Sequence, residues 1–216
     1  MSRHPLDLSL YLVTDTIRCG QHGVRATVVG AVRAGVTTVQ LRDQHASDEE
    51  LVALGREVLA ALDGSGVPLL INDRVHLVKT IGAQGAHIGQ SDLGIDEARA
   101  ILGQDAYLGL SAQTAEHVAA AMRHGLSNLD YLGVGPIWAQ STKPDATAPG
   151  GIQRLRAILA VSPWPCVAIG GIDADRAMAV RAAGGDGVAV VSAICGQPDV
   201  TAATEALRSA WDGSSA

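Results

Sequence analysis

The sequence alternates eight short apolar runs with segments whose apolar residues recur at helical spacing, and this alternation restricts the fold more than any other feature. Parallel strands need crossover connections, usually helices, and eight such units of roughly 20 to 30 residues close into a barrel of about this length. The runs expected to form strands are Leu8–Val13, Thr37–Leu41, Pro68–Ile71, Gly85–Ile88, Tyr107–Leu110, Tyr131–Val134, Cys166–Ile169 and Gly187–Val191. Helical spacing is clearest over Glu49–Leu62, Thr114–His124 and Asp173–Ala183.

We therefore predict an α/β protein built as a single (β/α)8 TIM barrel that occupies residues 1–216, with short flexible termini and a loose tail over residues 212–216. A doubly wound open sheet is the main alternative, but no Gly-x-Gly-x-x-Gly motif follows the first strand. Hydrophobic residues make up 47% of the chain, whereas aromatic residues make up 3% and Phe is absent. Aliphatic residues must therefore fill the core, as is typical of parallel strands buried on both faces.

The charge balance argues against some classes of partner. Lys and Arg number 16 and Asp and Glu number 22, so the net charge is -6 with His neutral. Binding to nucleic acid or to an anionic membrane needs clustered positive charge, so we expect neither partner. A phosphorylated ligand must instead be bound by a few well-placed cations or by a metal ion.

The cysteines and the hydropathy pattern indicate a soluble cytoplasmic protein. Cys19, Cys166 and Cys195 are odd in number and show no paired spacing, which favours a reducing compartment. The apolar run Leu8–Val13 is too short for a signal peptide, and no apolar run reaches about 18 residues.

Polar residues follow the predicted strands, and the active site of such a barrel forms where the strands end. Arg42 follows the second strand and offers a planar fork of donors for phosphate oxygens, although a salt bridge to Asp43 or to a helix carboxylate would also explain an arginine at this position.

Asp73 and Asp92 follow the third and fourth strands. Neighbouring strands lie about 4.8 Å apart, so the two carboxylates can share one Mg²⁺. The alternative for Asp92 is to cap the next helix.

A second group of strand-end residues predicts a metal-free phosphate site. Gly170-Gly171 follows the seventh strand and Ser192 follows the eighth, where barrels often bind phosphate through backbone N–H groups. Ser111, after the fifth strand, is expected either to contact a ligand oxygen or to cap a helix.

The long loop after the sixth strand breaks at Gly135-Pro136 and has no helical spacing. Its polar residues are suited to binding phosphate oxygens, and the alternative is a solvated surface loop. These residues are Gln140, Ser141, Thr142 and Lys143.

These motifs, in this order along nearly the whole chain, resemble those of the thiamine phosphate synthase family. The motifs are Gln40-Leu41-Arg42, Asn72-Asp73, Gly89-Gln90-Ser91-Asp92-Leu93, Gly133-x-Gly135-Pro136, Thr142-Lys143-Pro144, Ile169-Gly170-Gly171-Ile172 and Gly187-Val188-Ala189-Val190-Val191-Ser192. The family is a (β/α)8 barrel that joins 4-amino-2-methyl-5-(diphosphooxymethyl)pyrimidine to 4-methyl-5-(2-phosphooxyethyl)thiazole, and it releases diphosphate. The resemblance thus implies a transferase of thiamine biosynthesis whose partners are small phosphorylated molecules, and self-association stays open.

The resemblance also assigns roles to residues. Asp73 and Asp92 would bind Mg²⁺. The pyrimidine diphosphate would be bound by Arg42, Asn72, Ser111 and Lys143, of which Arg42, Ser111 and Lys143 would act in catalysis. The thiazole phosphate would be bound by Gln140, Ser141, Thr142, Gly171, Val191 and Ser192. Gln40, Gln44 and Gly170 complete the predicted substrate-binding set.

Three positions depart from the family pattern. Trp138 replaces the more usual smaller aromatic residue, which we interpret as a packing change. Gln44 stands where the family usually has Lys, so the diphosphate site lacks one cation. Gln113 stands where the related thiazole tautomerase uses a His. Two alternatives remain, a tautomerase-like isomerase and a non-catalytic barrel that binds thiazole phosphate. The seven histidines show no metal-ligand spacing, and we interpret them as surface or packing residues.

Overall fold

The computed structural model describes residues 4–141 and 148–213, and its eight strands form a closed barrel in the order β1 to β8. All neighbouring strands are parallel. The strands are β1 (Leu10–Val13), β2 (Thr38–Leu41), β3 (Leu69–Asn72), β4 (Gly85–Ile88), β5 (Tyr107–Ala112), β6 (Tyr131–Val134), β7 (Cys166–Ile169) and β8 (Gly187–Val190). The predicted fold class is confirmed.

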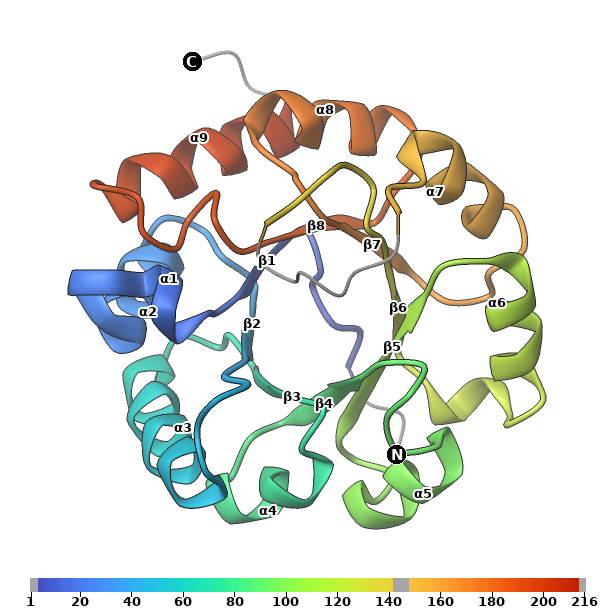
Figure 1. Cartoon of the computed structure of the whole chain (residues 1–216), viewed down its shortest axis with the longest axis horizontal. Coiled ribbons are helices and arrows are strands. Elements are labelled where there is room, and N and C mark those ends of the chain that lie inside the picture. The colour runs from blue at the N-terminus through green and yellow to red at the C-terminus, as the bar shows by residue number, and fades with distance from the viewer. Residues whose placement is uncertain (1–3, 142–147, 214–216) are drawn as a thin grey trace.

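Helices surround this barrel on the outside (Figure 1). The α-helices are α1 (Thr16–Cys19), α2 (Gly23–Arg33), α3 (Asp48–Leu62), α4 (Val78–Ile81), α5 (Ile95–Leu102), α6 (Ala115–Met122), α7 (Gly151–Leu159), α8 (Ala174–Ala182) and α9 (Val200–Asp212). Short 3-10 helices occur at η1 (Gly20–His22), η2 (Val75–Leu77) and η3 (Leu126–Asn128). None of the helices in the described residues is long and apolar enough to cross a membrane.

Local sequence signals explain several of the helix starts. The Ser47 hydroxyl accepts a hydrogen bond from the Glu50 backbone N–H, and the Glu50 carboxylate accepts one from the Ser47 N–H, so α3 begins with a capping box. The Asp173 carboxylate caps α8 by accepting a hydrogen bond from the Arg176 backbone N–H. The prediction of a tail over residues 212–216 was wrong at its start, because Asp212 is the last residue of α9 and forms an ion pair with Arg208 one turn earlier. Residues 214–216 lie outside the described residues.

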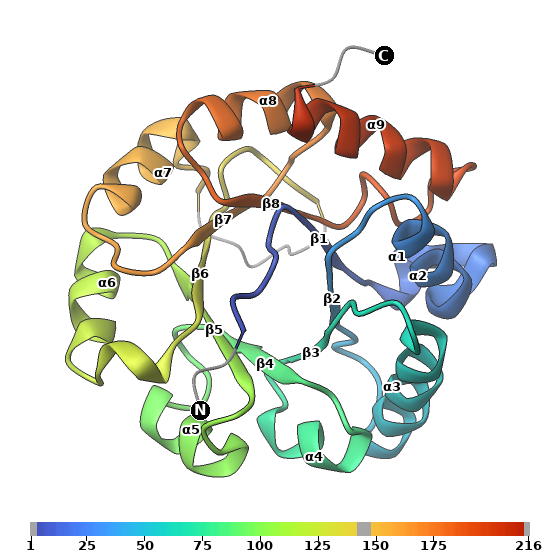
Figure 2. The same ribbon diagram turned by 180° about the vertical axis from the view of Figure 1, so that it is seen from behind.

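The core has two parts, which follow from the alternation of side chains along each strand. Tyr11, Leu70, Tyr131 and Val167 belong to a cluster inside the barrel. Their neighbours in sequence, such as Leu10, instead belong to the larger cluster shared with the helices. The N-terminal segment crosses one end of the barrel, as the view from behind shows (Figure 2), and Tyr107 Oη donates to the His4 carbonyl oxygen at 3.0 Å. The opposite end, where the strands finish, carries the loops.

Arg99 is a buried cation whose hydrogen bonds tie α5 to the loops at the beginning of β5 and β6. Its side chain is 4% exposed and donates to the carbonyl oxygens of Gly103, Ala106 and Asn128 at 2.7 to 3.2 Å. It also forms an ion pair with Asp130 at 3.4 Å. The guanidinium therefore has partners on all sides and serves stability.

We expect Arg99→Met to lower the free energy of unfolding by about 3 kcal/mol, because it leaves three partly buried carbonyl groups and the Asp130 carboxylate without their donor. Urea denaturation followed by circular dichroism measures this change. Arg25→Ala, at an exposed position of α2, is the matched control and should change the midpoint little. Equal midpoints for the Arg99 variant and the unchanged protein would contradict the assignment.

Candidate functional site

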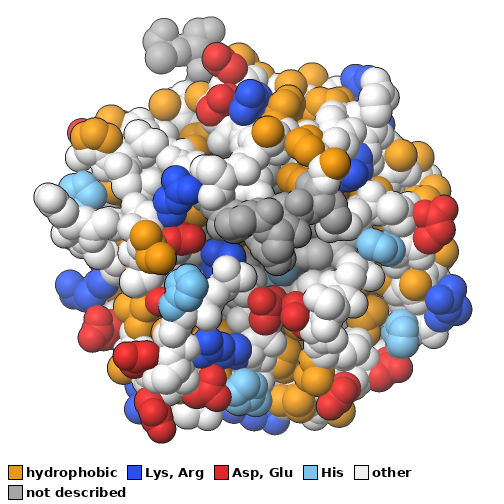
Figure 3. All heavy atoms as spheres, in the orientation of Figure 1, with side chains coloured by type: hydrophobic (Ala, Val, Ile, Leu, Met, Phe, Trp, Pro, Cys, Tyr) orange, Lys and Arg blue, Asp and Glu red, His pale blue; other side chains and the backbone are white. Residues whose placement is uncertain are grey.

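Most of the predicted site residues come together around one cavity of about 450 Å³ at the ends of the strands. Those that line it are Gln40, Arg42, Gln44, Asn72, Asp73, Asp92, Ser111, Gln140, Gly170, Gly171, Val191 and Ser192. Acidic and basic side chains lie close together near the centre of this face (Figure 3). A cavity of about 550 Å³ lies at the other end, between the N-terminal segment and residues such as Asp63 and Gln84. We place the functional site at the strand ends, since the opposite end of a TIM barrel serves stability.

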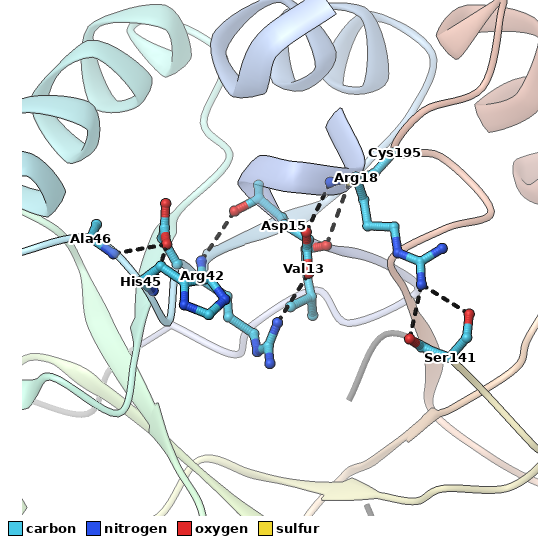
Figure 4. A network of polar contacts seen from close by, with 10 residues as sticks. Val13, Asp15, Arg18, Arg42, His45, Ala46, Ser141 and Cys195 are labelled. Carbon is cyan, nitrogen blue, oxygen red and sulfur yellow. Dashed lines mark hydrogen bonds and ion pairs between the residues drawn. The ribbon is translucent and has the colours of Figure 1, made fainter. Parts of the chain in front are cut away.

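Arg42 reaches the cavity from the end of β2, and one nitrogen of its guanidinium group has no hydrogen-bond acceptor in the described residues. The residue is 9% exposed, and its Nη1 forms an ion pair with the Asp15 carboxylate at 3.2 Å (Figure 4). Among the residues that the structure describes, its Nη2 is the one buried side-chain nitrogen or oxygen without a hydrogen-bond partner. A buried guanidinium N–H that lacks an acceptor costs free energy, and an anion in the cavity would remove this cost.

The alternative of an Arg42 salt bridge to Asp43 was wrong. The Asp43 carboxylate instead accepts hydrogen bonds from the backbone N–H groups of His45 and Ala46. The partner of Arg42 is Asp15, a residue of the loop after β1 that also caps α1 through the Arg18 N–H. Asp15 was not predicted as a site residue.

The two predicted metal ligands line the same cavity from consecutive strand ends. Asp73 has a φ of 58°, in the left-handed region that residues other than glycine seldom adopt. Its backbone N–H donates to the His87 carbonyl oxygen at 2.9 Å, which holds it beside the end of β4. Strained backbone of this kind concentrates at functional sites. The structure thus brings the Asp73 carboxyl group to the cavity at an energetic cost.

Asp92 is held by the turn after β4 rather than by the next helix. Its Oδ2 accepts a hydrogen bond from the Gly89 N–H at 2.7 Å, and α5 is capped by Gly94, so the capping alternative for Asp92 was wrong. A Cβ atom at position 89 would lie 2.9 Å from this carboxylate oxygen, so a larger residue there would have to shift the Asp92 side chain.

A metal site at this place would depend on ligands beyond the protein. Within the described ranges, no group of three or more His, Cys, Asp and Glu side chains is placed to hold a metal ion. Two carboxylates beside the amide of Asn72 offer hard oxygen ligands. This donor set fits Mg²⁺, which binds one or two protein carboxylates and fills its other positions with water and phosphate oxygens, and it does not fit a closed zinc site.

The turn after β7 borders the cavity on another side. Gly170 and Gly171 have φ values of 104° and 63°, and a Cβ atom on Gly171 would lie 2.4 Å from the Ala139 carbonyl oxygen. The Trp138 N–H donates to the Gly170 carbonyl oxygen at 3.0 Å, so the first part of the loop after β6 lies along this turn. Only glycine allows this close approach with a positive φ.

The loop after β6 agrees only in part with the predicted site. Gln140 lines the cavity, but Ser141 does not. Ser141 is exposed, and its carbonyl and hydroxyl oxygens accept hydrogen bonds from Arg18 Nη2 at 2.8 and 3.0 Å (Figure 4). The predicted residues Thr142 and Lys143 lie outside the described residues.

Three residues of the cavity floor were missed. Tyr11, Tyr131 and His87 line the cavity from inside the barrel, a position that the interpretation of the histidines as surface or packing residues did not include for His87. His87 Nδ1 lies 2.9 Å from Tyr131 Oη, and its Nε2 lies 2.9 Å from Ser111 Oγ. Ser111 is part of β5, and α6 is capped by Thr114, so the capping alternative for Ser111 was also wrong. The signal that could have identified His87 is a polar residue within an apolar strand.

The fold and this cavity define a (β/α)8 barrel enzyme of the class that acts on small phosphorylated molecules. The family model for thiamine monophosphate synthase matches residues 10–194. Thiamine-phosphate synthases of Psychrobacter sp. and Azorhizobium caulinodans are 48% and 46% identical to the chain, over 200 and 205 residues. These matches cover 93% of both chains for the first and 95% for the second.

A solved structure, thiamine phosphate pyrophosphorylase from Pyrococcus furiosus, is 30% identical to this chain. It aligns with a TM-score of 0.86 over 98% of both chains. The chain therefore belongs to the thiamine monophosphate synthase family. The predictions of the family, the fold and a transferase of thiamine biosynthesis are confirmed.

Proposed function

We propose that this chain joins the pyrimidine diphosphate to the thiazole phosphate and releases thiamine phosphate and diphosphate. The observation that carries the proposal is the free Nη2 of Arg42 in the same cavity as Asp73 and Asp92, opposite a glycine turn suited to a second phosphate. One cavity can therefore hold two phosphorylated substrates with their reacting groups between the two anion sites. Family membership supports the choice of substrates.

The reaction needs no nucleophile from the protein. The bond between the pyrimidine CH₂ group and the diphosphate oxygen breaks first, and its electron pair leaves with diphosphate. The electron-rich aminopyrimidine stabilises the resulting carbocation, and the lone pair of the thiazole nitrogen then forms the new C–N bond. The task of the protein is to position both substrates and to stabilise the charge on the leaving group.

We assign the leaving diphosphate to the side of the cavity that carries Arg42. Its Nη2 would donate to a phosphate oxygen, and Asn72 of β3 and Ser111 of β5 would also donate. Lys143 would add a second cation, an assignment that rests on the family resemblance. Asp73 and Asp92 would hold Mg²⁺, which when bound neutralises charge on the diphosphate.

The thiazole phosphate would lie at the opposite side. Gly170, Gly171, Val191 and Ser192 border the cavity there, and backbone N–H groups of such turns bind phosphate well. Gln140 reaches the cavity from the adjoining loop. The resemblance adds Ser141 and Thr142 to this subsite, and it supports a cytoplasmic location for the enzyme.

The direct test is to incubate the purified protein with both substrates and MgCl₂. We expect thiamine phosphate by liquid chromatography and one equivalent of diphosphate by ³¹P NMR, and we expect a chelator to stop the reaction. Omission of either substrate is the control. Failure to form product, with both substrates shown to bind, would reject the transferase and leave the non-catalytic barrel. Chelator-resistant isomerisation of the thiazole would support the tautomerase.

Gln44 offers a separate test of the diphosphate side, since its exposed side chain lines the cavity two residues beyond Arg42. Gln44→Lys should lower the KM for the pyrimidine diphosphate by about fivefold, the effect of one partly screened ion pair of roughly 1 kcal/mol. Gln44→Glu should raise this KM. The same KM for both variants would mean that position 44 does not face the diphosphate.

A further inference from the structure

Five polar side chains from five different strands form one continuous hydrogen-bonded chain across the cavity floor. Its members, in spatial order, are Gln40 of β2, Tyr11 of β1, Tyr131 of β6, His87 of β4 and Ser111 of β5. The four donor-to-acceptor distances along it are 2.7, 2.8, 2.9 and 2.9 Å. All five residues line the cavity, so both ends of the chain, Gln40 and Ser111, face the space that a ligand would occupy.

The backbone around this chain leaves room for its rings. A Cβ atom on Gly109 of β5 would lie 2.1 Å from Tyr131 Cζ, and a Cβ atom on Gly133 of β6 would lie 2.9 Å from His87 Cε1. The Tyr11 and Tyr131 rings meet edge to face with centroids 5.9 Å apart. Glycines at these two strand positions therefore allow the rings to lie against the backbone. A core that only fills space does not require such glycines.

One direction of donation satisfies every group in this chain, and it starts from Gln40. Gln40 Nε2 donates to Tyr11 Oη, and each phenol has a single hydrogen to donate onward. Burial raises the pKa of both phenols well above 10, so both stay protonated. In that direction Tyr11 donates to Tyr131, and Tyr131 donates to His87 Nδ1, at the 2.8 and 2.9 Å distances of these two contacts. A neutral His87 must carry its proton on Nε2, which donates to Ser111 Oγ.

We propose that Tyr11, Tyr131 and His87 are positioning residues that fix the donor and acceptor roles of the two side chains at the ends of the chain. The Ser111 oxygen accepts from His87, so its own hydrogen is directed to the ligand. The Gln40 amide donates to Tyr11, so its carbonyl oxygen is left to accept from the ligand. No titration of these residues is needed for this arrangement.

The fixed roles match the proposed substrate, and this part of the inference rests on the proposed function. A hydroxyl whose hydrogen points to the ligand suits an anionic diphosphate, and a carbonyl oxygen suits the amino group of the pyrimidine. Reversal of the chain would turn an oxygen lone pair toward the anion and an NH₂ group toward the amino group. Both contacts would then be unfavourable.

The tautomer of His87 is the direct test, and it needs no substrate. Long-range ¹H–¹⁵N NMR on the uniformly labelled, ligand-free protein at pH 8 should show the proton of the neutral imidazole on Nε2. The signal is assigned by its loss in His87→Gln. A proton on Nδ1 would reverse every hydrogen bond in the chain and would overturn the proposal, whether or not the protein makes thiamine phosphate.

A double-mutant cycle tests the functional consequence. Tyr131→Phe should lower kcat by about tenfold, the effect of one lost hydrogen bond of ordinary strength, without changing the KM for the thiazole phosphate. It should also move the His87 proton away from pure Nε2 occupancy. In the Tyr131→Phe background, Ser111→Ala should have much less effect than it has alone, because the donor role of Ser111 is already lost. Fully additive effects of the two substitutions would overturn the proposal.

Two further variants serve as a control and as a replacement in this double-mutant cycle. Tyr107→Phe removes a phenol hydroxyl at the opposite end of the barrel and should leave kcat unchanged. Tyr11→Phe interrupts the same chain one step earlier and serves if Tyr131→Phe does not fold, as judged by thermal unfolding. An inactive protein with the Nε2 tautomer would disprove the proposed function alone and leave the direction of the chain intact.

Discussion

Asp73→Asn and Asp92→Asn should each lower the rate of thiamine phosphate formation by roughly a hundredfold or more, the scale of losing one charged contact to a developing transition state. Each substitution removes one negative charge from the candidate Mg²⁺ site and preserves the size of the side chain. Asn tolerates the left-handed backbone at position 73, and an amide oxygen at position 92 can still accept from the Gly89 N–H. We therefore expect lost activity in a folded protein.

The measurement is the initial rate as a function of MgCl₂ concentration, with circular dichroism to verify folding. Half-maximal rates should require much more Mg²⁺ in both variants than in the unchanged protein. Asp105→Asn is the matched control, because it removes one exposed carboxylate just before β5, far from the strand ends. If all three variants respond to Mg²⁺ alike, the ion does not bind at Asp73 and Asp92.

The barrel could be predicted because its signals are local. Each apolar run, each crossover helix and each capping residue lies within a short window, and the observed strands begin and end within two residues of the predicted ones. The parallel topology then brings the residues after every strand to the same end. This is why Arg42, Asp73, Asp92 and Gly171 line one cavity although they lie far apart in sequence.

The floor of the site could not be predicted in the same way. Strands buried on both faces show little alternation of polar and apolar residues, so the sequence does not say which side chains point into the barrel. Tyr11 and Tyr131 therefore look like ordinary core residues, and His87 has a partner 44 positions away. Arg18 and Ser141 are separated by 123 positions, and their contact depends on closure of the barrel.

Arg42→Met should lower kcat/KM for the pyrimidine diphosphate by roughly a hundredfold or more, since it removes the free donor of the candidate diphosphate site. Arg42→Lys should recover little of this loss, because a single ammonium group cannot pair with Asp15 and also donate from the position of Nη2. The KM for the thiazole phosphate should stay within about twofold. Steady-state kinetics with each substrate varied in turn measure these effects.

Asp15→Asn tests whether activity depends on the Arg42 Nη2 donor or on the ion pair between Arg42 and Asp15. An amide at position 15 can still cap α1, and Arg42 keeps its free Nη2, so we expect a loss of less than about tenfold. A loss as large as that of Arg42→Met would mean that the ion pair, rather than the free donor, is what activity requires. It would then remove the main support for the diphosphate site.

Arg42→Met and Arg99→Met should differ in their effect on stability, because the two buried arginines differ in their hydrogen-bond partners. Arg99 donates to three carbonyl groups, whereas Arg42 keeps a buried N–H without an acceptor in the described residues. Removal of an unsatisfied donor gives back its desolvation cost, so Arg42→Met should change the free energy of unfolding by no more than about 1 kcal/mol. Urea denaturation of both variants compares them directly. A severe loss of stability in Arg42→Met would identify Arg42 as a structural residue like Arg99. Retained stability together with lost turnover would show that Arg42 serves ligand binding rather than folding.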